Sequence, residues 1–192
     1  MIHELGLSAE DEAELKSARD MMGKGEFAPA VEKLVPLFNR LPDGDARTYV
    51  ANNLGFAFSR EEFSGYDRER AIQYYSVSAS AQSPYGYRGI VGCLHKMGRT
   101  PEAIDWARKG SEDGVGICSY YLYKELIKKP DCEQAKAALA KSATQGFVMG
   151  VQRYAMRRIL GQYGWRQIIP GIAAYFGNMR ALWTYIKENT PD

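Results

Sequence analysis

The sequence contains few residues of the kinds that build catalytic, metal or disulfide sites. Only two of its 192 residues are histidines, His3 and His95, and neither has a patterned partner for general acid–base work. The three cysteines, Cys93, Cys118 and Cys132, form no close pair and no zinc-type spacing. We therefore expect no enzyme, no cofactor and no metal site, and the cysteine usage favours a reducing compartment.

Two further features are missing: a strong excess of charge and a long apolar run. The net charge is +2, from 25 basic and 23 acidic side chains, which argues against a nucleic-acid partner because such binding needs a concentrated basic face. The longest apolar stretch, Ile168 to Phe176, is interrupted by Pro170 and Gly171 and is about half of a membrane span. The acidic start, Met1 to Glu12, does not resemble a signal peptide. These observations predict a cytoplasmic protein and make a membrane role unlikely.

What the sequence does contain is a spacing of 32 residues that recurs along its second half. Small residues keep this step at Gly86, Cys118 and Gly150. Alanines keep it at Ala71, Ala103 and Ala135, and glycines at Gly114 and Gly146. Residues that match in size at one interval indicate a single structural unit used several times. The small positions are expected where two helices cross closely, so Cys118 is interpreted as buried and inert.

Nearly every segment between the breakers has helical character. Ser8 and Asp11 form a capping-box pattern that opens a first helix to about Met22. Further helices are predicted at about 29–39 and 45–60, with the next starting near Asp67 and with joints at Ser83-Pro84, Gly98-Arg99, Asp113-Gly114, Lys129-Pro130 and Gly146. No segment alternates polar and apolar residues convincingly. The sequence thus predicts an all-α chain.

The predicted architecture is a right-handed α-solenoid of antiparallel helix pairs, with about nine to eleven helices. We expect one domain over residues 1–192. It would comprise an N-terminal helix (1–25), repeats over 26–162 that start near Ala30, Ala71, Ala103 and Ala135, and a C-terminal cap (163–192). In the cap, Pro170 is expected to break a helix, and a last helix at about 177–187 places Leu182, Trp183 and Ile186 on one side.

These repeats resemble the Sel1-like family, a branch of the tetratricopeptide-like (TPR-like) helical repeats. The pattern of that family is matched by Leu54-Gly55, Phe58, Ala71, Tyr74 and Tyr75, by Ala103, Trp106, Gly110, Gly114, Cys118 and Leu122, and by Ala135, Ser142, Ala143, Gly146, Gly150 and Gly161. Gln82 departs from it, because a helix-ending glycine is usual there. Val91, Tyr123 and Ala155 also replace a glycine.

The resemblance implies a concave groove that binds a protein or peptide. When the helix register of the family is applied to this sequence, ten residues are expected to line the groove: Tyr49, Asn52, Phe56, Tyr85, Arg88, His95, Tyr120, Lys124, Gln152 and Met156. Aromatic anchors mixed with polar hydrogen-bonding groups suit such a surface. The alternative interpretation of several of these aromatics is that they belong to the core.

We therefore predict a non-catalytic interaction module that acts as an adaptor or regulator. One alternative is an immunity-type inhibitor that neutralises a cognate bacterial toxin or effector. This alternative comes from the resemblance, because short Sel1-like proteins resemble such inhibitors in bacteria. Another is a membrane-peripheral protein that uses the C-terminal helix, where Phe176, Trp183 and Tyr185 are large apolar groups. The glycine series Gly86-x-x-Gly89-x-x-Gly92 lies within a predicted helix, so close helix packing explains it better than a phosphate loop.

Overall fold

The structure is a computed structural model that describes residues 5–128 and 133–189. These residues form eleven α-helices, one short 3-10 helix and no strand, which confirms the all-α class. The helices are α1 (Ala9–Gly23), α2 (Phe27–Arg40), α3 (Asp45–Phe58), α4 (Arg68–Ser80), α5 (Pro84–Lys96), α6 (Thr100–Glu112), α7 (Gly116–Leu126), α8 (Glu133–Thr144), α9 (Val148–Ile159), η2 (Trp165–Gln167), α10 (Ile168–Gly177) and α11 (Met179–Asn189). His3 and Cys132 lie outside the described residues.

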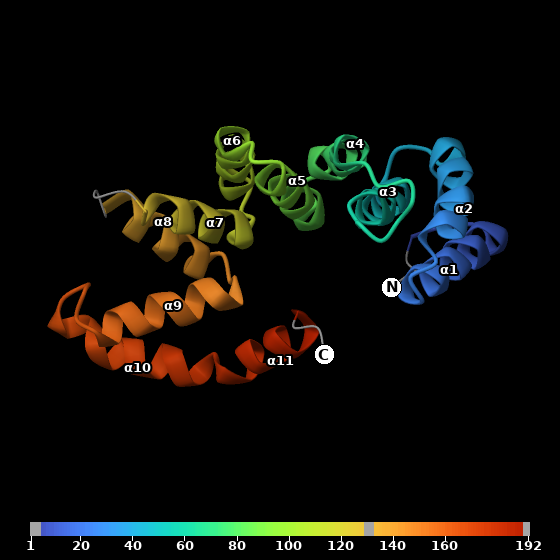
Figure 1. Ribbon diagram of the computed structural model, residues 1–192. Helices are drawn as coiled ribbons and strands as arrows, with labels where there is room; N and C mark the ends of the chain where they lie inside the picture. The colour runs from blue at the N-terminus through green and yellow to red at the C-terminus, as the bar shows by residue number, and fades with distance from the viewer. Residues whose placement is uncertain (1–4, 129–132, 190–192) are drawn as a thin grey trace. The chain divides into compact units, whose positions relative to one another are not determined.

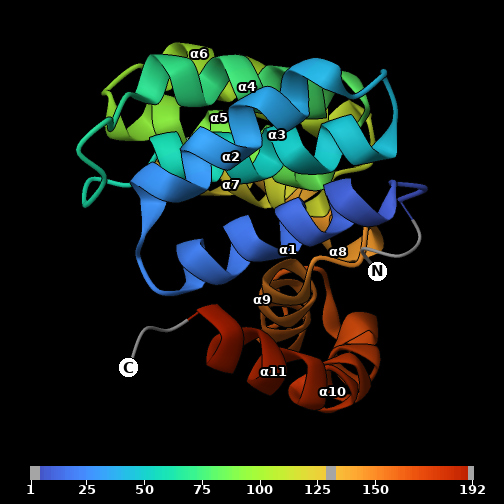
Figure 2. The ribbon, with the colours of Figure 1, turned by 90° about the vertical axis from the view of Figure 1, so that its right-hand side faces the viewer.

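The chain groups into two compact units, an N-terminal unit (Met1–Trp106) and a C-terminal unit (Ala107–Asp192). In the N-terminal unit each helix from α1 to α5 packs against the next one in the chain (Figures 1 and 2). In the C-terminal unit α7 packs against α8, α8 against α9, and both α10 and α11 pack against α9. Helices that follow each other in sequence are thus neighbours in space, as expected for a chain of helical repeats.

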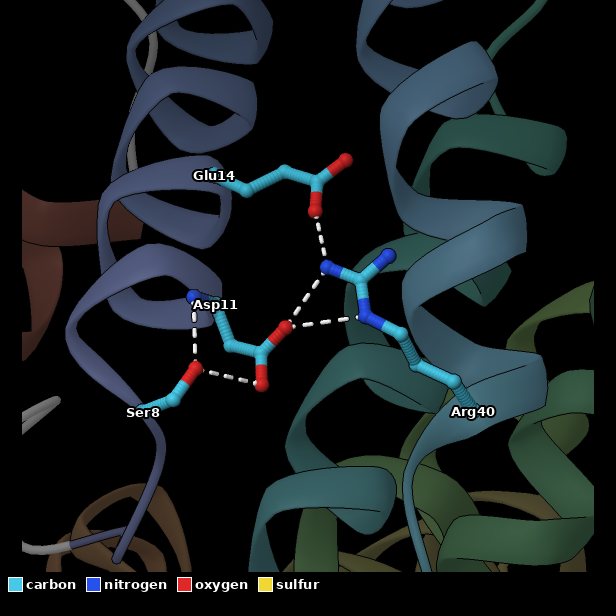
Figure 3. A network of polar contacts seen from close by, with 4 residues as sticks. All are labelled: Ser8, Asp11, Glu14 and Arg40. Atoms are coloured by element: carbon cyan, nitrogen blue, oxygen red, sulfur yellow. Dashed lines mark hydrogen bonds and ion pairs between the residues drawn. The ribbon is translucent and has the colours of Figure 1, made fainter.

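The N-terminal helix pair is joined by a polar network (Figure 3). The Ser8 hydroxyl accepts a hydrogen bond from the Asp11 backbone N–H at 3.1 Å and donates one to the Asp11 carboxylate at 2.8 Å, which confirms the predicted cap. Arg40, at the end of α2, reaches across to Asp11 Oδ1 at 2.6 Å and also pairs with Glu14. The hydrogen bond from Arg40 lowers the pKa of Asp11. This network fixes α1 against α2 at its outer edge.

The small residues of the 32-residue repeat lie where helices cross. A Cβ built on Gly86 would stand 2.4 Å from the backbone nitrogen of Ala79, so α4 and α5 are in main-chain contact there. A Cβ on Gly150 would stand 2.2 Å from the Ser142 hydroxyl. Cys118 is buried as expected, and burial raises the pKa of its thiol to about 12, which keeps it protonated and poorly nucleophilic.

The turns before α5, α7 and α9 share one backbone conformation. Gln82, Gly114 and Gly146 are 32 residues apart, and their φ values of 56°, 87° and 75° are all left-handed. Only glycine adopts this conformation without steric cost. Gln82 is the single non-glycine residue with positive φ among the described residues. The repeat therefore keeps its turn geometry even where the expected glycine is absent.

A polar cluster of two buried serines and a half-buried glutamine joins α6, α7 and the turn after α8. The hydroxyls of Ser111 and Ser119 share a hydrogen bond of 2.7 Å, and Ser119 donates to Gln145 Oε1 at 2.5 Å. The amide of Gln145 closes the cluster by donating to the Ser111 carbonyl at 2.8 Å. Because the polar side-chain groups are satisfied, the cluster can be buried without a large desolvation penalty.

The C-terminal region differs from the sequence prediction in one respect. Pro170 was expected to break a helix, but it lies in the first turn of α10, which begins at Ile168. The prediction was wrong because a first-turn proline lacks only a donor that would have no partner within the helix. The actual break falls at Gly177 and Asn178, and α11 runs from Met179 to Asn189.

Candidate functional site

The N-terminal unit contains a pocket of about 680 Å³ that is lined by residues of α1, α3, α4 and α5. Tyr49, Asn52 and Phe56 line it from α3, one helical turn apart, because residues three and four apart share a helix face. Arg88, Gly92 and Lys96 repeat this geometry on α5 at a spacing of four. The pocket is thus formed by matching faces of two helices that belong to successive helix pairs.

Small residues allow an aromatic ring to form the inner wall of the pocket. Cβ atoms built on Gly55 and Gly89 would stand 2.8 Å and 2.5 Å from the ring of Tyr75. The Tyr75 ring is therefore held closely by two helices, and its burial raises the pKa of its hydroxyl to about 12. By contrast, no atom lies within 4 Å of a Cβ built on Gly92. Gly92 leaves open space, so the packing role predicted for the whole glycine series holds for Gly86 and Gly89 only.

Asn52 is held in place by side chains of the neighbouring helix pair. Its side-chain oxygen accepts a hydrogen bond from Ser78 at 2.6 Å, and its amide donates to the Ser83 hydroxyl at 3.3 Å. Ser78 is fully buried, so this amide cannot rotate freely. On the next residue of α3, the Asn53 amide donates to the Tyr49 carbonyl at 2.8 Å. The polar side of the pocket is therefore set before any ligand arrives, which reduces the entropy cost of binding.

The charged side chains of the pocket all have one sign. Arg19, Arg68, Arg88 and Lys96 line it, and no Asp or Glu is among its lining residues. Arg68 is engaged by Glu61 at 2.5 Å, and the guanidinium of Arg19 lies 5.8 Å from the centre of the Tyr49 ring. The site therefore has a positive potential that favours a negatively charged ligand.

Two aromatic side chains at the pocket remain accessible to a ligand. Tyr85 is 67% exposed and Phe56 is 43% exposed, although both are large groups that proteins usually bury at least in part. Phe56 also lies beside a cation, since the guanidinium of Arg60 is 5.4 Å from its ring centre. Exposed aromatics next to arginines are characteristic of protein-binding surfaces.

The structure brings together half of the residues predicted to line the groove. Tyr49, Asn52, Phe56, Tyr85 and Arg88 all line this pocket. His95 is exposed on α5 but is not among the lining residues. The sequence analysis missed Arg19, Arg68 and Lys96; only Lys96 carried a usable signal, because it lies two helical turns after Arg88 on the same face.

The other four predicted residues belong to the C-terminal unit and differ from one another in exposure. Lys124 and Met156 are exposed, whereas Tyr120 is half-buried against the rings of Tyr123 and Phe147. Gln152 is buried, with its amide directed at the sulfur of Met179 at 3.9 Å and its oxygen accepting from Asn178 at 3.3 Å. The exposed groove position predicted for Gln152 is therefore corrected, because α11 covers it.

Within the described part of the chain, no group of three or more His, Cys, Asp or Glu residues is placed to hold a metal ion. Over the same residues, none of the helices combines the length and the apolar character that crossing a membrane requires.

Solved structures with the same arrangement of helices were found by comparison. A Sel1 repeat protein from Oxalobacter formigenes is similar over 86% of this chain and 69% of its own, with a TM-score of 0.61 and 16% identity. The structure of MamA is similar over 88% of this chain and 97% of its own, with a TM-score of 0.55 and 13% identity. No protein-family model and no curated protein matches the sequence. The chain therefore has the Sel1-like, TPR-like helical repeat fold.

Proposed function

We propose that this protein is a non-catalytic interaction module, and that it binds an acidic segment of a partner protein in the pocket between α3 and α5. The observation that supports the proposal is the composition of the residues that line the pocket. It combines four cations, no carboxylate and two exposed aromatic rings. A segment with Asp or Glu next to an apolar side chain would satisfy both features at once.

The rigid construction of the pocket supports binding over catalysis. Asn52 is hydrogen-bonded to Ser78 and Ser83, and Tyr75 is held between two helices. The ionisable groups nearest the inner wall are unsuited to proton transfer near neutral pH, because burial raises the pKa values of Tyr75 and Cys93.

The test compares what the wild-type protein and charge-reversed variants retain from an extract of the native cell. We expect Arg88→Glu with Lys96→Glu to lose the specific partner, because the pocket then repels acidic segments. Arg153→Glu is the matched control, since Arg153 is an exposed arginine of the C-terminal unit. Circular dichroism should show unchanged helicity in both variants. A partner retained at wild-type strength by the double variant would place the binding surface elsewhere.

A defined probe tests the chemistry of the ligand directly. Fluorescein-labelled pools of random peptides containing Asp, Glu, Leu and Phe should raise the anisotropy signal with the wild-type protein. Pools in which Lys replaces the acidic residues should not. An adaptor would bind its partner with micromolar affinity through such a short segment, whereas a dedicated immunity-type inhibitor would bind one folded protein with nanomolar affinity.

A further inference from the structure

The end of the chain exposes far more apolar surface than the rest. Large apolar side chains that lie largely in solvent are concentrated between residues 160 and 186, and they include Trp165, Ile169, Ile172, Phe176, Met179 and Trp183. The exposed fractions reach 76% for Trp165, 80% for Ile169 and 73% for Trp183. Exposed apolar side chains gathered in one region of a protein surface mark an interaction site.

These side chains share one face of the two last helices. Ile169, Ile172 and Phe176 are spaced i, i+3 and i+7 along α10, which places them on one side of it. The opposite side of α10 carries Gly171, where an added Cβ would stand 2.8 Å from the Cβ of Arg158 on α9. Trp183, which is 73% exposed, continues the exposed side on α11, whereas the sulfur of Met179 is directed toward Gln152 on α9.

The ribbon views show how the two helices are placed. α10 and α11 follow one another along one side of α9, and no other helix of the C-terminal unit lies on their far side (Figures 1 and 2). We refer to the exposed residues Trp165, Ile169, Ile172, Phe176 and Trp183 as the C-terminal apolar face.

The charge around this face is predominantly positive, and Glu188 is the only acidic residue of η2, α10 and α11. Residues 134–187 contain eight Lys or Arg residues and no Asp or Glu. Three of these cations, Arg166, Arg180 and Lys187, belong to η2 and α11 and are exposed. The nearly neutral total of the chain therefore conceals a basic C-terminal segment that is balanced by acidic residues elsewhere.

We propose that the C-terminal apolar face binds the surface of an anionic lipid bilayer, with α10 and α11 lying in the plane of the interface. Aromatic and aliphatic side chains on one face with lysine and arginine beside them are the composition that binds such surfaces. Tryptophan prefers the boundary between headgroups and acyl chains, and each nearby cation adds attraction to anionic lipid. α10 has only ten residues, so it lies on the bilayer rather than across it.

The positive charge near the C-terminal apolar face favours an anionic lipid bilayer over a second copy of the chain as its partner. Two copies that met through the C-terminal apolar face would bring Arg166, Arg180 and Lys187 of each together, with Glu188 as the only carboxylate of η2, α10 and α11 to offset them. Like charges at an interface disfavour association, whereas an anionic surface neutralises them. The lack of a long apolar run argued against a membrane role, yet a membrane-peripheral protein that uses the C-terminal helix is one alternative that the sequence predicts. The exposed face assembled from two short helices supports that alternative.

The test measures co-sedimentation of the full chain with two kinds of vesicle, phosphatidylcholine alone and phosphatidylcholine mixed with phosphatidylglycerol. The wild type should bind the mixed vesicles, with a blue shift of tryptophan emission as Trp165 and Trp183 enter the interface. Ile169→Gln with Phe176→Gln should lower the partition coefficient by about tenfold or more, since two large apolar groups are lost. Arg166→Gln with Arg180→Gln should lower it by about tenfold on the mixed vesicles.

Val77→Gln is the matched control, because Val77 is an exposed apolar residue of the N-terminal unit. It should bind as the wild type does, and all variants should keep their helicity because the altered residues are exposed. The proposal is overturned if the wild type binds neither vesicle, if the Ile169 and Phe176 variant binds unchanged, or if both vesicle types bind equally. Sedimentation velocity measures whether the protein dimerises instead. A dimer that the same variant abolishes, without vesicle binding, would assign the face to a second copy.

Discussion

Arg88 and Gln152 occupy the same position of the repeat, two steps of 32 residues apart, yet their surroundings are opposite. Arg88 is exposed on α5 and lines the pocket of the N-terminal unit. Gln152 is buried on α9, where Asn178 and Met179 at the start of α11 contact its side chain. The repeat determines which face of the helix a residue occupies, but the elements that follow the repeat decide whether that face stays open.

At the turns before these helices the opposite holds, because the structure stays the same although the residue changes. Gln82, Gly114 and Gly146 keep a left-handed backbone in all three repeats, although only two of them are glycines. The backbone conformation of this turn is therefore more alike between the repeats than the identity or the exposure of equivalent residues is. The following predictions test how far the equivalence of the repeats extends.

The largest effect is expected at the helix crossing of the N-terminal unit. Gly86→Ala should lower the free energy of unfolding by about 3 kcal/mol, because the new methyl group meets the backbone of Ala79 rather than a mobile side chain. Gly150→Ala should cost less, since its closest contact is the Ser142 hydroxyl, which can rotate away at the loss of its hydrogen bond to the Gly116 carbonyl. The Ser142 Cβ at 2.9 Å must still shift slightly.

Gly92→Ala, on the same helix as Gly86, is the control for this experiment. It meets no atom within 4 Å and should raise stability by roughly 0.5–1 kcal/mol through its higher helix propensity. Urea unfolding followed by circular dichroism measures all three variants. Equal costs for Gly86→Ala and Gly150→Ala would show that the two crossings are equivalent after all.

Exchanging the residue types at the equivalent positions Arg88 and Gln152 should change the free energy of unfolding by different amounts. Gln152→Arg should destabilise the protein by about 2 kcal/mol, because it places a charge in a buried site that offers no carboxylate. Arg88→Gln lies at an exposed position and should change stability by no more than about 0.5 kcal/mol. Thermal or urea unfolding distinguishes the two. A neutral Gln152→Arg would mean that α11 does not cover this position in solution.

A smaller gain is expected at the turn where the repeat departs from glycine. Gln82→Gly should stabilise the protein by about 1 kcal/mol, since it removes the steric cost of the left-handed conformation. Gly114→Gln should have the opposite sign and a similar size. Measuring both in the same denaturant series checks the sign. If Gln82→Gly were destabilising, the side chain would have to make a compensating contact.

The smallest effect concerns pH and the polar network of α1 and α2. The hydrogen bond from Arg40 lowers the pKa of Asp11 from 3.8, so the folded state binds this proton less readily than the unfolded state. The carboxylate therefore adds stability above pH 3.8, and this contribution disappears as the pH falls through the lowered value. Both groups are solvent-accessible, so the effect is small.

The Asp11→Asn variant measures this contribution. Its unfolding midpoint in urea should lie slightly below that of the wild type near neutral pH, and the two midpoints should converge at strongly acidic pH. A difference that grew as the pH fell would contradict the assigned direction of the pKa shift.

Most of the architecture could be inferred from local patterns. Ser8 with Asp11 marked the first helix, and the spacing of Gly86, Cys118 and Gly150 marked the crossings, because caps and close contacts depend on a few neighbouring residues. The start of α10 was missed, since a proline such as Pro170 has opposite meanings in the first turn and in the interior of a helix.

The candidate pocket was only partly accessible to the same reasoning. Tyr49, Asn52 and Phe56 followed from the register of one helix. Arg19 could not be found in this way, because α1 lies outside the repeats and reaches the pocket only through the packing of the N-terminal unit. Arg68 was likewise missed, since nothing in its own segment indicates which neighbour it meets.

By itself the sequence determined the helical class, the repeat length and the small residues at the crossings, because these follow from the periodicity and size of nearby side chains. The tertiary structure alone decided which repeat face remains open, which cations meet at one pocket, and that the last two helices leave their apolar side uncovered. The physical reason is that exposure depends on every element packed against a residue, and those elements are distant in the chain.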